Sequence, residues 1–197
     1  STDDYCKKHE LKTEDYWNNK SCRIYHFIGK DIIYFHFLFW PAMLMGAELK
    51  LPDSIIVHGF LTVHGQKMSK SRGTFLTADE FAVQYNPEYL RFYYAKSLSK
   101  KLADINLDFN ELRDTINNDL LGNFGNFCYR TLSFIEKNFQ LEIGEIIVDE
   151  ELISNINTLV MRIRENYSNA NFNEAVKNIL NISAIGNRYF QNNEPWK

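Results

Sequence analysis

Residues 23–46, RIYHFIGKDIIYFHFLFWPAMLMG, decide the fold of the first part of the chain. Arg23 to Ile28 alternates weakly between polar and apolar residues, a pattern that favours a β-strand. The tripeptide Gly29-Lys30-Asp31 then predicts a tight turn from the strand into a helix. An aspartate in the first helical turn suits the positive end of the helix dipole, so the helix is expected to begin at this turn.

The segment that follows, Ile32 to Ala47, predicts one helix. It is apolar on nearly every side, so we expect this helix to be buried all round. Pro41 removes one backbone donor and should kink the helix, and Gly46 should end it. The run includes His36 and Pro41 and is shorter than the roughly 20 apolar residues that a bilayer crossing needs, so no membrane span is expected.

The middle of the chain predicts strand, loop and helix in turn. Ser54 to Val63 is rich in Ile, Val, Phe and Thr and indicates a strand or a bent pair of strands. His64 to Gly73 has the glycines, lysines and arginine of a loop. A short helix should follow, capped by Thr77 or Asp79, and Pro87 should occupy the first turn of the next helix.

The last part of the chain, after about residue 105, has no strand signal and predicts helices alone. Apolar residues recur at spacings of three and four, as expected for one face of a long helix. They are Leu112, Ile116, Leu120, Phe124, Cys128, Leu132, Ile135 and Phe139. Two more helices are expected, roughly at 149–166 and 173–191. The sequence therefore indicates an α/β unit followed by an all-α bundle.

Composition and charge are those of an ordinary folded protein. The chain has 197 residues, 45% of them hydrophobic, and a formal net charge of −3. That charge argues against a uniformly basic nucleic-acid coat, although a local basic patch is enough to attract a phosphate backbone. The odd cysteine count, Cys6, Cys22 and Cys128 without a CxxC pair, predicts a reducing, cytoplasmic setting and no zinc site. The acidic start, residues 1–4, is unlike a signal peptide.

The strongest chemical signal is Lys67-Met68-Ser69-Lys70-Ser71. Two ammonium groups and two hydroxyls alternate on a loop flanked by glycines, after a predicted strand. Such a loop can close over a polyphosphate, with the lysines as mobile point charges and backbone N–H groups as further donors. A run of Lys and Ser is also common on exposed loops that bind nothing, so the pattern of residue types leaves both interpretations open.

These five residues spell the KMSKS signature of class I aminoacyl-tRNA synthetases. The continuation Ser71-Arg72-Gly73-Thr74 resembles the methionyl-tRNA synthetases within that class. Residues 27–32, 34–42 and 57–60 are similar to the same family, and residues 184–197 resemble the close of its anticodon domain. The resemblance covers nearly the whole chain. It implies the second half of a Rossmann-type nucleotide-binding domain followed by an α-helical anticodon-binding bundle.

The resemblance also implies an ATP site, which the residues themselves support. Gly29 and Asp31 stand at the carboxyl end of a predicted strand and the start of a helix, where sheet-based nucleotide sites lie. Asp31 suits the ribose hydroxyls, although a turn glycine and a helix-capping acid are the alternative. The catalytic residues are expected to be Lys67 and Lys70. The ATP-binding residues are expected to be Gly29, Asp31, His58, Lys67, Ser69 and Lys70.

Ile32, His36 and Trp40 recur every four residues and predict one face of the first helix. Alone, this pattern also fits a core stripe with one satisfied histidine. The positions match the methionine-pocket residues of the resembled family, and a thioether gains from contact with an aromatic edge. We therefore expect Ile32, His36 and Trp40 to bind methionine.

Asn126 and Arg130 are four residues apart and should share an exposed face of the long helix, opposite its apolar stripe. Amide and guanidinium groups there can read base edges, but most such faces are only solvated. By resemblance these residues and Trp196 read the anticodon, and unpaired bases do stack on aromatic rings.

The resemblance implies a ligase that joins methionine to its tRNA through methionyl-adenylate. ATP with Mg²⁺, methionine and the methionine tRNA are the expected partners, and no metal site is expected in the chain itself. The second class I signature, His-x-Gly-His, is absent. We therefore expect an N-terminal half to be missing, so that this chain alone should be inactive.

The predicted domains are residues 1–72 for the catalytic half, 73–105 for a connective region and 106–197 for the anticodon-binding bundle. Two alternatives stay open at this point. One is a synthetase-like tRNA-binding module without catalysis, and the other is a different class I aminoacyl-tRNA synthetase.

Overall fold

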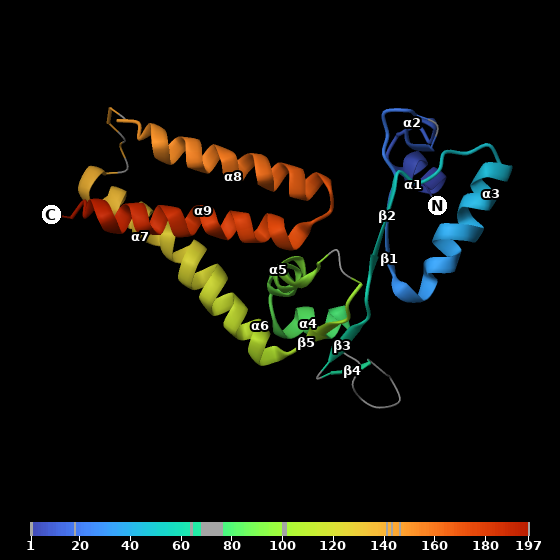
Figure 1. Cartoon of the computed structure of the whole chain (residues 1–197), viewed down its shortest axis with the longest axis horizontal. Coiled ribbons are helices and arrows are strands. Elements are labelled where there is room, and N and C mark those ends of the chain that lie inside the picture. Colours follow the sequence, from blue (N-terminus) through green and yellow to red (C-terminus); the bar gives the residue numbers. More distant parts are fainter. Residues whose placement is uncertain are drawn as a thin grey trace. The chain divides into compact units, whose positions relative to one another are not determined.

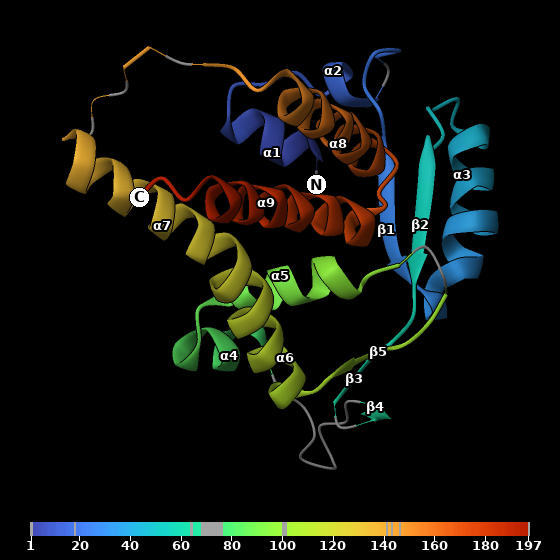
Figure 2. The same ribbon diagram turned by 60° about the vertical axis from the view of Figure 1, so that its left-hand side comes forward.

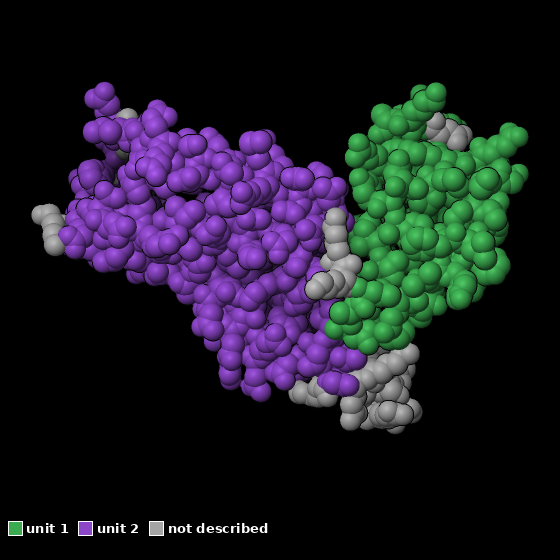
Figure 3. All heavy atoms as spheres, viewed as in Figure 1, with its two compact units in different colours: residues 1–60, 100–104 green, residues 61–99, 105–197 purple. Residues whose placement is uncertain are grey.

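The computed structural model describes residues 2–17, 19–63, 65–67, 77–99, 102–140, 142, 144–145 and 147–196. The chain forms two compact units (Figure 3). The first consists of Ser1–Phe60 with Lys100–Asp104, and the second of Leu61–Ser99 with Ile105–Lys197.

The first unit contains a strand–helix–strand arrangement (Figure 1). Its elements are α1 (Thr2–Lys8), α2 (Glu14–Trp17), β1 (Tyr25–Gly29), the 3-10 turn η1 (Lys30–Ile32), the π-helical turn η2 (Phe35–Phe39), α3 (Trp40–Gly46) and β2 (Ser54–His58). Strands β1 and β2 are parallel. A parallel pair needs a crossover connection, and the helix from η1 to α3 supplies it. The predicted strand, turn and helix are confirmed, including the helix end at Gly46.

The prediction that this helix is buried all round is wrong. Leu44 is only 2% exposed and Ile33 and Trp40 are half-buried, but most of the other large apolar side chains are exposed. These are Tyr34, Phe35, Phe37, Leu38, Phe39, Met43 and Met45. The helix lies beside β1 and β2 in both ribbon views (Figures 1 and 2). A sheet of two strands covers one side of a helix and leaves its other side open.

The backbone just before Pro41 is π-helical, at Phe35–Phe39. Pro41 stands in the first turn of α3 and has no N–H to donate to the preceding turn. A π turn satisfies backbone groups with a different spacing, and such turns are a known cause of irregular helices. The helix is therefore irregular directly before the proline, where a kink was predicted.

The second unit begins with a small sheet and two helices. The sheet has the order β4 (Gln66–Lys67), β3 (Leu61–Val63), β5 (Ile105–Leu107), with β3 antiparallel to β4 and parallel to β5. The helices are α4 (Ala78–Gln84) and α5 (Pro87–Ser97). Thr77 caps α4 in a capping box with Glu80, and Pro87 opens α5, both as predicted. The predicted bent pair of strands is β2 and β3, which lie in different sheets.

Three long helical segments complete this unit. The first runs continuously through α6 (Phe109–Thr115), the π-helical stretch η4 (Ile116–Gly125) and α7 (Asn126–Phe139). The others are α8 (Glu150–Ser168) and α9 (Phe172–Asn193), which form an antiparallel pair (Figure 1). One core cluster consists of Val63, Phe81, Tyr93, Leu107, Leu112 and Ile116. All three predicted helices are confirmed.

The apolar stripe predicted along the long helix holds only in its first part. Leu112 and Ile116 are buried, but Phe124 and Phe139 are exposed and Leu132 is 60% exposed. The π-helical stretch η4 lies between the two parts, and its wider turns rotate every later side chain relative to a regular α-helix. No helix in the described part of the chain combines the length and apolar character that a bilayer crossing requires.

Candidate functional site

The carboxyl ends of β1 and β2 bring two predicted ATP-site residues together. Gly29 is paired in register with His58, the last residue of β2. Asp31 follows in the first turn of the helix, and a Cβ added to Gly29 would lie 2.6 Å from its Oδ1. Any side chain at position 29 would therefore displace this carboxylate. Asp31 is exposed, and Gly29 and His58 are half-buried, so the Asp31 carboxylate at this edge is accessible.

His58 makes a local contact at this edge. Its Nδ1 lies 3.1 Å from the carbonyl oxygen of Gly59. This contact requires a proton on Nδ1 of His58, because a carbonyl oxygen can only accept a hydrogen bond. The other ring nitrogen, Nε2, is then an acceptor while the ring is neutral.

The turn between β1 and the helix is tied to a segment far along the chain. Lys30 Nζ donates to Asp104 Oδ1 at 2.7 Å, and the Phe60 backbone N–H donates to the same oxygen at 2.8 Å. These two hydrogen bonds hold the pKa of Asp104 below its usual value, and the bond from Lys30 has the larger effect. The Lys30 ammonium also lies 4.5 Å from the centre of the Phe60 ring. Sequence reasoning missed Asp104, because nothing local links it to a turn 74 residues away.

A close backbone approach supports the same connection. A Cβ added to Gly59 would meet the carbonyl group of Ala103 and would lie 2.6 Å from the amide nitrogen of Asp104. Only glycine leaves room for the two backbones here. The positions of the Asp104 carboxylate and of the Lys30 turn are therefore set by backbone packing as well as by charge.

The predicted methionine-binding face has a polar partner that the sequence did not reveal. His36 and Trp40 are half-buried and Ile32 is 36% exposed. Nδ1 of His36 lies 3.0 Å from Nδ1 of His26 on β1, with the two rings almost perpendicular. Burial lowers the pKa of His26, and the neighbouring His36 ring lowers it further. The alternation of β1 placed His26 on a strand but gave no sign of which helix residue it would face.

The structure describes only the start of the signature loop. Gln66 and Lys67 form β4, and the Lys67 backbone pairs with Thr62 on β3. Ser69 and Lys70, the other predicted residues of this loop, lie outside the described residues. Among the residues that are described, no three His, Cys, Asp or Glu side chains gather closely enough to hold a metal ion.

The predicted anticodon residues Arg130 and Trp196 meet at one ring. The Arg130 guanidinium lies 5.0 Å from the centre of the Phe190 ring, and the Trp196 ring centre lies 5.7 Å from it on α9's C-terminal side. Arg130 Nη2 also donates to Gln191 Oε1 at 2.9 Å. Trp196 is 48% exposed, so its ring offers a surface to a ligand.

Asn126 lies on the same side of α7, where Nδ2 donates to Asn187 Oδ1 at 3.3 Å. Both residues were expected to be exposed: Asn126 is exposed, whereas Arg130 is half-buried, and both side chains donate hydrogen bonds to α9. The π-helical stretch η4 causes the difference, because it rotates α7 relative to the predicted stripe. Phe190, Gln191 and Asn187 were missed because the antiparallel register of α7 and α9 cannot be read from either helix alone.

Known proteins resemble this chain closely. A family model described as "tRNA synthetases class I (M)" matches residues 1–132. "Methionine--tRNA ligase" of Psychrobacter sp. (strain PRwf-1) is 44% identical over 190 residues, which are 95% of this chain and 27% of the relative. The "Methionine--tRNA ligase" of Vesicomyosocius okutanii subsp. Calyptogena okutanii (strain HA) is 41% identical over 98% of this chain and 35% of its own length.

A solved structure shows the same fold. Mycobacterium tuberculosis methionyl-tRNA synthetase bound by methionyl-adenylate superposes with a TM-score of 0.78 at 30% identity, over 90% of this chain and 35% of that one. The chain thus spans between about a quarter and a third of the length of the proteins it matches. Since the family match covers two thirds of the sequence and the relatives cover nearly all of it, the chain belongs to the methionyl-tRNA synthetases of class I.

Proposed function

We propose that this chain is part of an enzyme that activates methionine with ATP and transfers it to the methionine tRNA. The proposal rests first on one observation, the register that sets Gly29 beside His58 with Asp31 directly after them. In open α/β sheets, ligands bind outside the carboxyl ends of the strands. We assign this edge to the adenosine of ATP, with Asp31 on the ribose hydroxyls and Gly29 allowing the backbone to approach.

The phosphates of ATP are assigned to Lys67, Ser69 and Lys70. The reaction needs no covalent enzyme intermediate, so positioning and charge stabilisation carry the catalysis. Lysine ammonium groups on a loop can follow the charge that develops on the departing pyrophosphate. Mg²⁺ is usually held by substrate phosphates with one or two carboxylates, and we propose that it arrives with ATP.

The methionine side chain is assigned to the face formed by Ile32, His36 and Trp40. The Trp40 ring offers an aromatic edge to the sulfur, and such contacts contribute about 0.3–1.5 kcal/mol. His36 uses Nδ1 in its contact with His26, which leaves Nε2 for a bound amino acid. This leaves one polar group in an otherwise apolar wall.

The other half of the active site is proposed to come from a longer protein. The relatives are about three to four times the length of this chain, and its sequence lacks His-x-Gly-His. The exposed apolar side of the helix from Tyr34 to Met45 has the character of a surface that another part of a protein covers. We propose that the segment with His-x-Gly-His packs there and completes the ATP site.

The end of the helical bundle is assigned to the anticodon. Arg130 and Trp196 both contact Phe190, and Asn126 lies one turn before Arg130 on the same helix. Guanidinium and amide groups can pair with base edges, and a half-exposed indole ring can stack on an unpaired base. Bound to tRNA, the bundle would hold the anticodon while the proposed ATP and methionine sites act at the 3′ end.

Asp31 tests the proposed ATP site most directly. In the longer protein, Asp31→Asn should raise the KM for ATP in methionine-dependent ATP–pyrophosphate exchange by about ten- to a hundredfold, because hydrogen bonds to charged groups contribute about 1.5–3 kcal/mol. Asp15→Asn, an exposed aspartate of the same unit on α2, is the matched control and should leave the KM unchanged. Equal KM values for the wild type and Asp31→Asn would refute the assignment.

The chain by itself tests the split site. Purified alone, it should catalyse no methionine-dependent exchange, and exchange should appear when the segment carrying His-x-Gly-His is present. Robust exchange by this chain alone would contradict the split site. If the protein is instead a non-catalytic tRNA-binding module, even the longer protein should show no ATP–pyrophosphate exchange but should still bind tRNA.

A further inference from the structure

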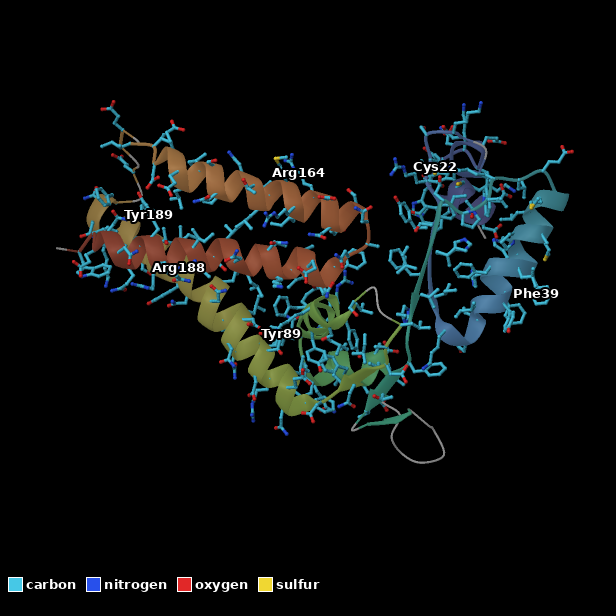
Figure 4. All side chains as sticks on the ribbon, in the orientation of Figure 1. Cys22, Phe39, Tyr89, Arg164, Arg188 and Tyr189 are labelled. Atoms are coloured by element: carbon cyan, nitrogen blue, oxygen red, sulfur yellow. The ribbon has the colours of Figure 1, made fainter. Side chains whose placement is uncertain are left out.

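An open groove of about 590 Å³ runs between α8 and α9, separate from the proposed anticodon cluster. Its polar lining consists mainly of Arg162, Arg188, Tyr189, Asn155, Asn181 and Asn192, and Leu and Ile side chains also line it. Arg188 and Tyr189 are labelled on α9 in Figure 4. They follow Asn187 and precede Phe190 and Gln191, which face α7. The last turns of α9 therefore present one set of side chains to α7 and another to this groove.

The groove is lined by positively charged side chains and by no negatively charged ones. Its ten lining residues include two arginines and no aspartate or glutamate. Among the described residues, ion pairs of the second unit involve Arg91, Lys96, Arg113 and Lys177, whereas Arg162 and Arg188 take no part in one. The chain as a whole is negative, so this is a local departure from its average. A groove of one sign of charge attracts ligands of the opposite sign.

The spacing of the two arginines along the helices suits an extended ligand. Arg162 lies six residues before the end of α8 at Ser168, and Arg188 lies sixteen residues after the start of α9 at Phe172. At about 1.5 Å per helical residue, the ten-residue difference separates the Cα atoms of the two arginines by roughly 15 Å along the helices. A stacked nucleic-acid strand places one phosphate about every 3.4 Å, so this distance spans roughly four phosphates.

The other side chains are those that contact RNA backbone. Phosphate and sugar oxygens are bound in nucleic-acid complexes by Arg, Asn and Tyr side chains, among others. The three asparagines of the groove supply amide donors and acceptors, and Tyr189, 40% exposed, adds a hydroxyl and a ring. Arginine is the cation best suited to phosphate because its donors form a fixed fork.

From this placement we infer that the α8–α9 groove is a second RNA-binding surface, which holds the sugar-phosphate backbone of the tRNA beside the anticodon cluster. The inference rests on the proposed tRNA binding of this chain. The two surfaces divide the work: Arg130, Trp196 and Asn126 recognise bases, whereas Arg162 and Arg188 contact phosphates and contribute affinity that does not depend on sequence. Losing the groove should therefore weaken all tRNAs alike.

The test is tRNA binding by the chain as a function of salt, with anisotropy of a labelled tRNA over about 50–200 mM monovalent salt. The groove pair is Arg162→Gln with Arg188→Gln. Each phosphate contact contributes about 0.7 to the slope of log K against log salt for a single strand and 0.9 for a duplex, so this pair should lower the slope by about 1.4–1.8. The loss should be equal for the cognate tRNA and for a tRNA with an altered anticodon.

The matched control removes the same charge from the same helices outside the groove. Arg164→Gln with Lys177→Gln changes one cation on α8 and one on α9, and neither residue lines the groove. Arg164 is labelled on α8 in Figure 4. This pair should keep the wild-type slope. The charge-conserving pair Arg162→Lys with Arg188→Lys should keep it as well, which separates a lost phosphate contact from a damaged fold.

Two results would overturn the groove assignment: an unchanged slope in the groove pair, or an equal fall in the Arg164/Lys177 control. Trp196→Ala tests the proposed function separately, because it should reduce the preference for the cognate anticodon without changing the slope. A wild-type chain that binds no tRNA at the lowest salt would refute both the anticodon assignment and the groove.

Discussion

His36 and His26 face each other with only 3.0 Å between their Nδ1 atoms. A hydrogen bond at this distance needs one ring to donate and the other to accept, so the pair accommodates one Nδ1 proton and not two. Through this contact, a residue on β1 determines which way the predicted methionine-binding histidine turns. His26 is thus a positioning residue for the wall formed by Ile32, His36 and Trp40.

The lowered pKa of His26 predicts that the first unit loses stability in acid. Burial first, and the His36 ring second, hold this pKa below the usual 6.5. Above that value the ring is neutral in both folded and unfolded chains, so its full contribution is present. As pH falls through 6.5, the unfolded chain takes up a proton that the folded chain resists, and stability declines until the folded pKa is passed.

Denaturant titrations at about pH 7.5 and pH 5.5 measure this decline. His26→Gln retains a hydrogen-bonding side chain that does not titrate, so its loss of stability between the two pH values should be smaller than that of the wild type. His9→Gln, a histidine of the same unit on the exposed surface, should behave as the wild type does. If the stability of His26→Gln depended on pH as strongly as that of the wild type, protonation of His26 would not be the cause of the loss of stability in acid.

Gly186→Ala should destabilise the helical bundle, although alanine is the better helix former. A Cβ at position 186 would lie 2.6 Å from Cζ of Phe127 and closer still to Cε2, where α9 crosses α7. Overpacking of this kind costs about 1–3 kcal/mol, and the gain in helix propensity is about 1 kcal/mol. The net loss in the free energy of unfolding should therefore be up to about 2 kcal/mol.

Gly46→Ala is the control, because a Cβ at the end of α3 meets nothing within 4 Å. Urea unfolding of the variants, followed by circular dichroism, gives both values. A Gly186→Ala chain as stable as the wild type would mean that Phe127 moves aside without penalty.

Lys70→Ala in the longer protein should slow methionine-dependent ATP–pyrophosphate exchange about a hundredfold, since one contact to a developing charge contributes about 3 kcal/mol. Methionine binding, measured by calorimetry, should change little, because the methionine wall is assigned to other residues. Lys12→Ala removes an exposed lysine from the first unit and should leave the exchange rate unchanged. Exchange by Lys70→Ala within about twofold of the wild type would remove Lys70 from the mechanism.

Trp196→Ala should lower the efficiency of tRNA charging by about ten- to a hundredfold, because base stacking on an aromatic ring contributes about 1–3 kcal/mol. ATP–pyrophosphate exchange should not change, because the phosphates of ATP are assigned to Lys67, Ser69 and Lys70 and not to Trp196. A tRNA with an altered anticodon should lose much of its disadvantage in this variant. If cognate and altered tRNAs lose equally, or if exchange falls as well, Trp196 holds the fold or a phosphate and does not read bases.

The sequence predicted those parts of the fold that depend on neighbouring residues. The strand–turn–helix at Gly29, the cap at Thr77 and the helix start at Pro87 all follow from local backbone preferences, and the structure has each of them. The approximate bounds of α8 and α9 followed equally well from apolar periodicity.

Features that depend on distant residues could not be predicted in this way. The bond from Lys30 to Asp104 joins residues 74 positions apart, and the contacts of Arg130 depend on how α9 is aligned against α7. Apolar character alone also gave a wrong prediction of burial for the helix from Tyr34 to Met45. An apolar side chain favours burial, but its identity does not show whether another part of this chain covers it. Ser69 and Lys70 lie outside the described residues, so their roles stay predictions.

The π-helical stretch Ile116–Gly125 has a consequence for length variation in this family. Each hydrogen bond in such a stretch encloses one residue more than in an α-helix. A one-residue deletion there can revert the stretch towards α geometry and leave the helix on either side in place. The same deletion inside α7 would turn all later residues by about 100° and move Phe134 away from the edge of Phe190. A one-residue deletion in related sequences should therefore be tolerated better between residues 116 and 125 than inside α7.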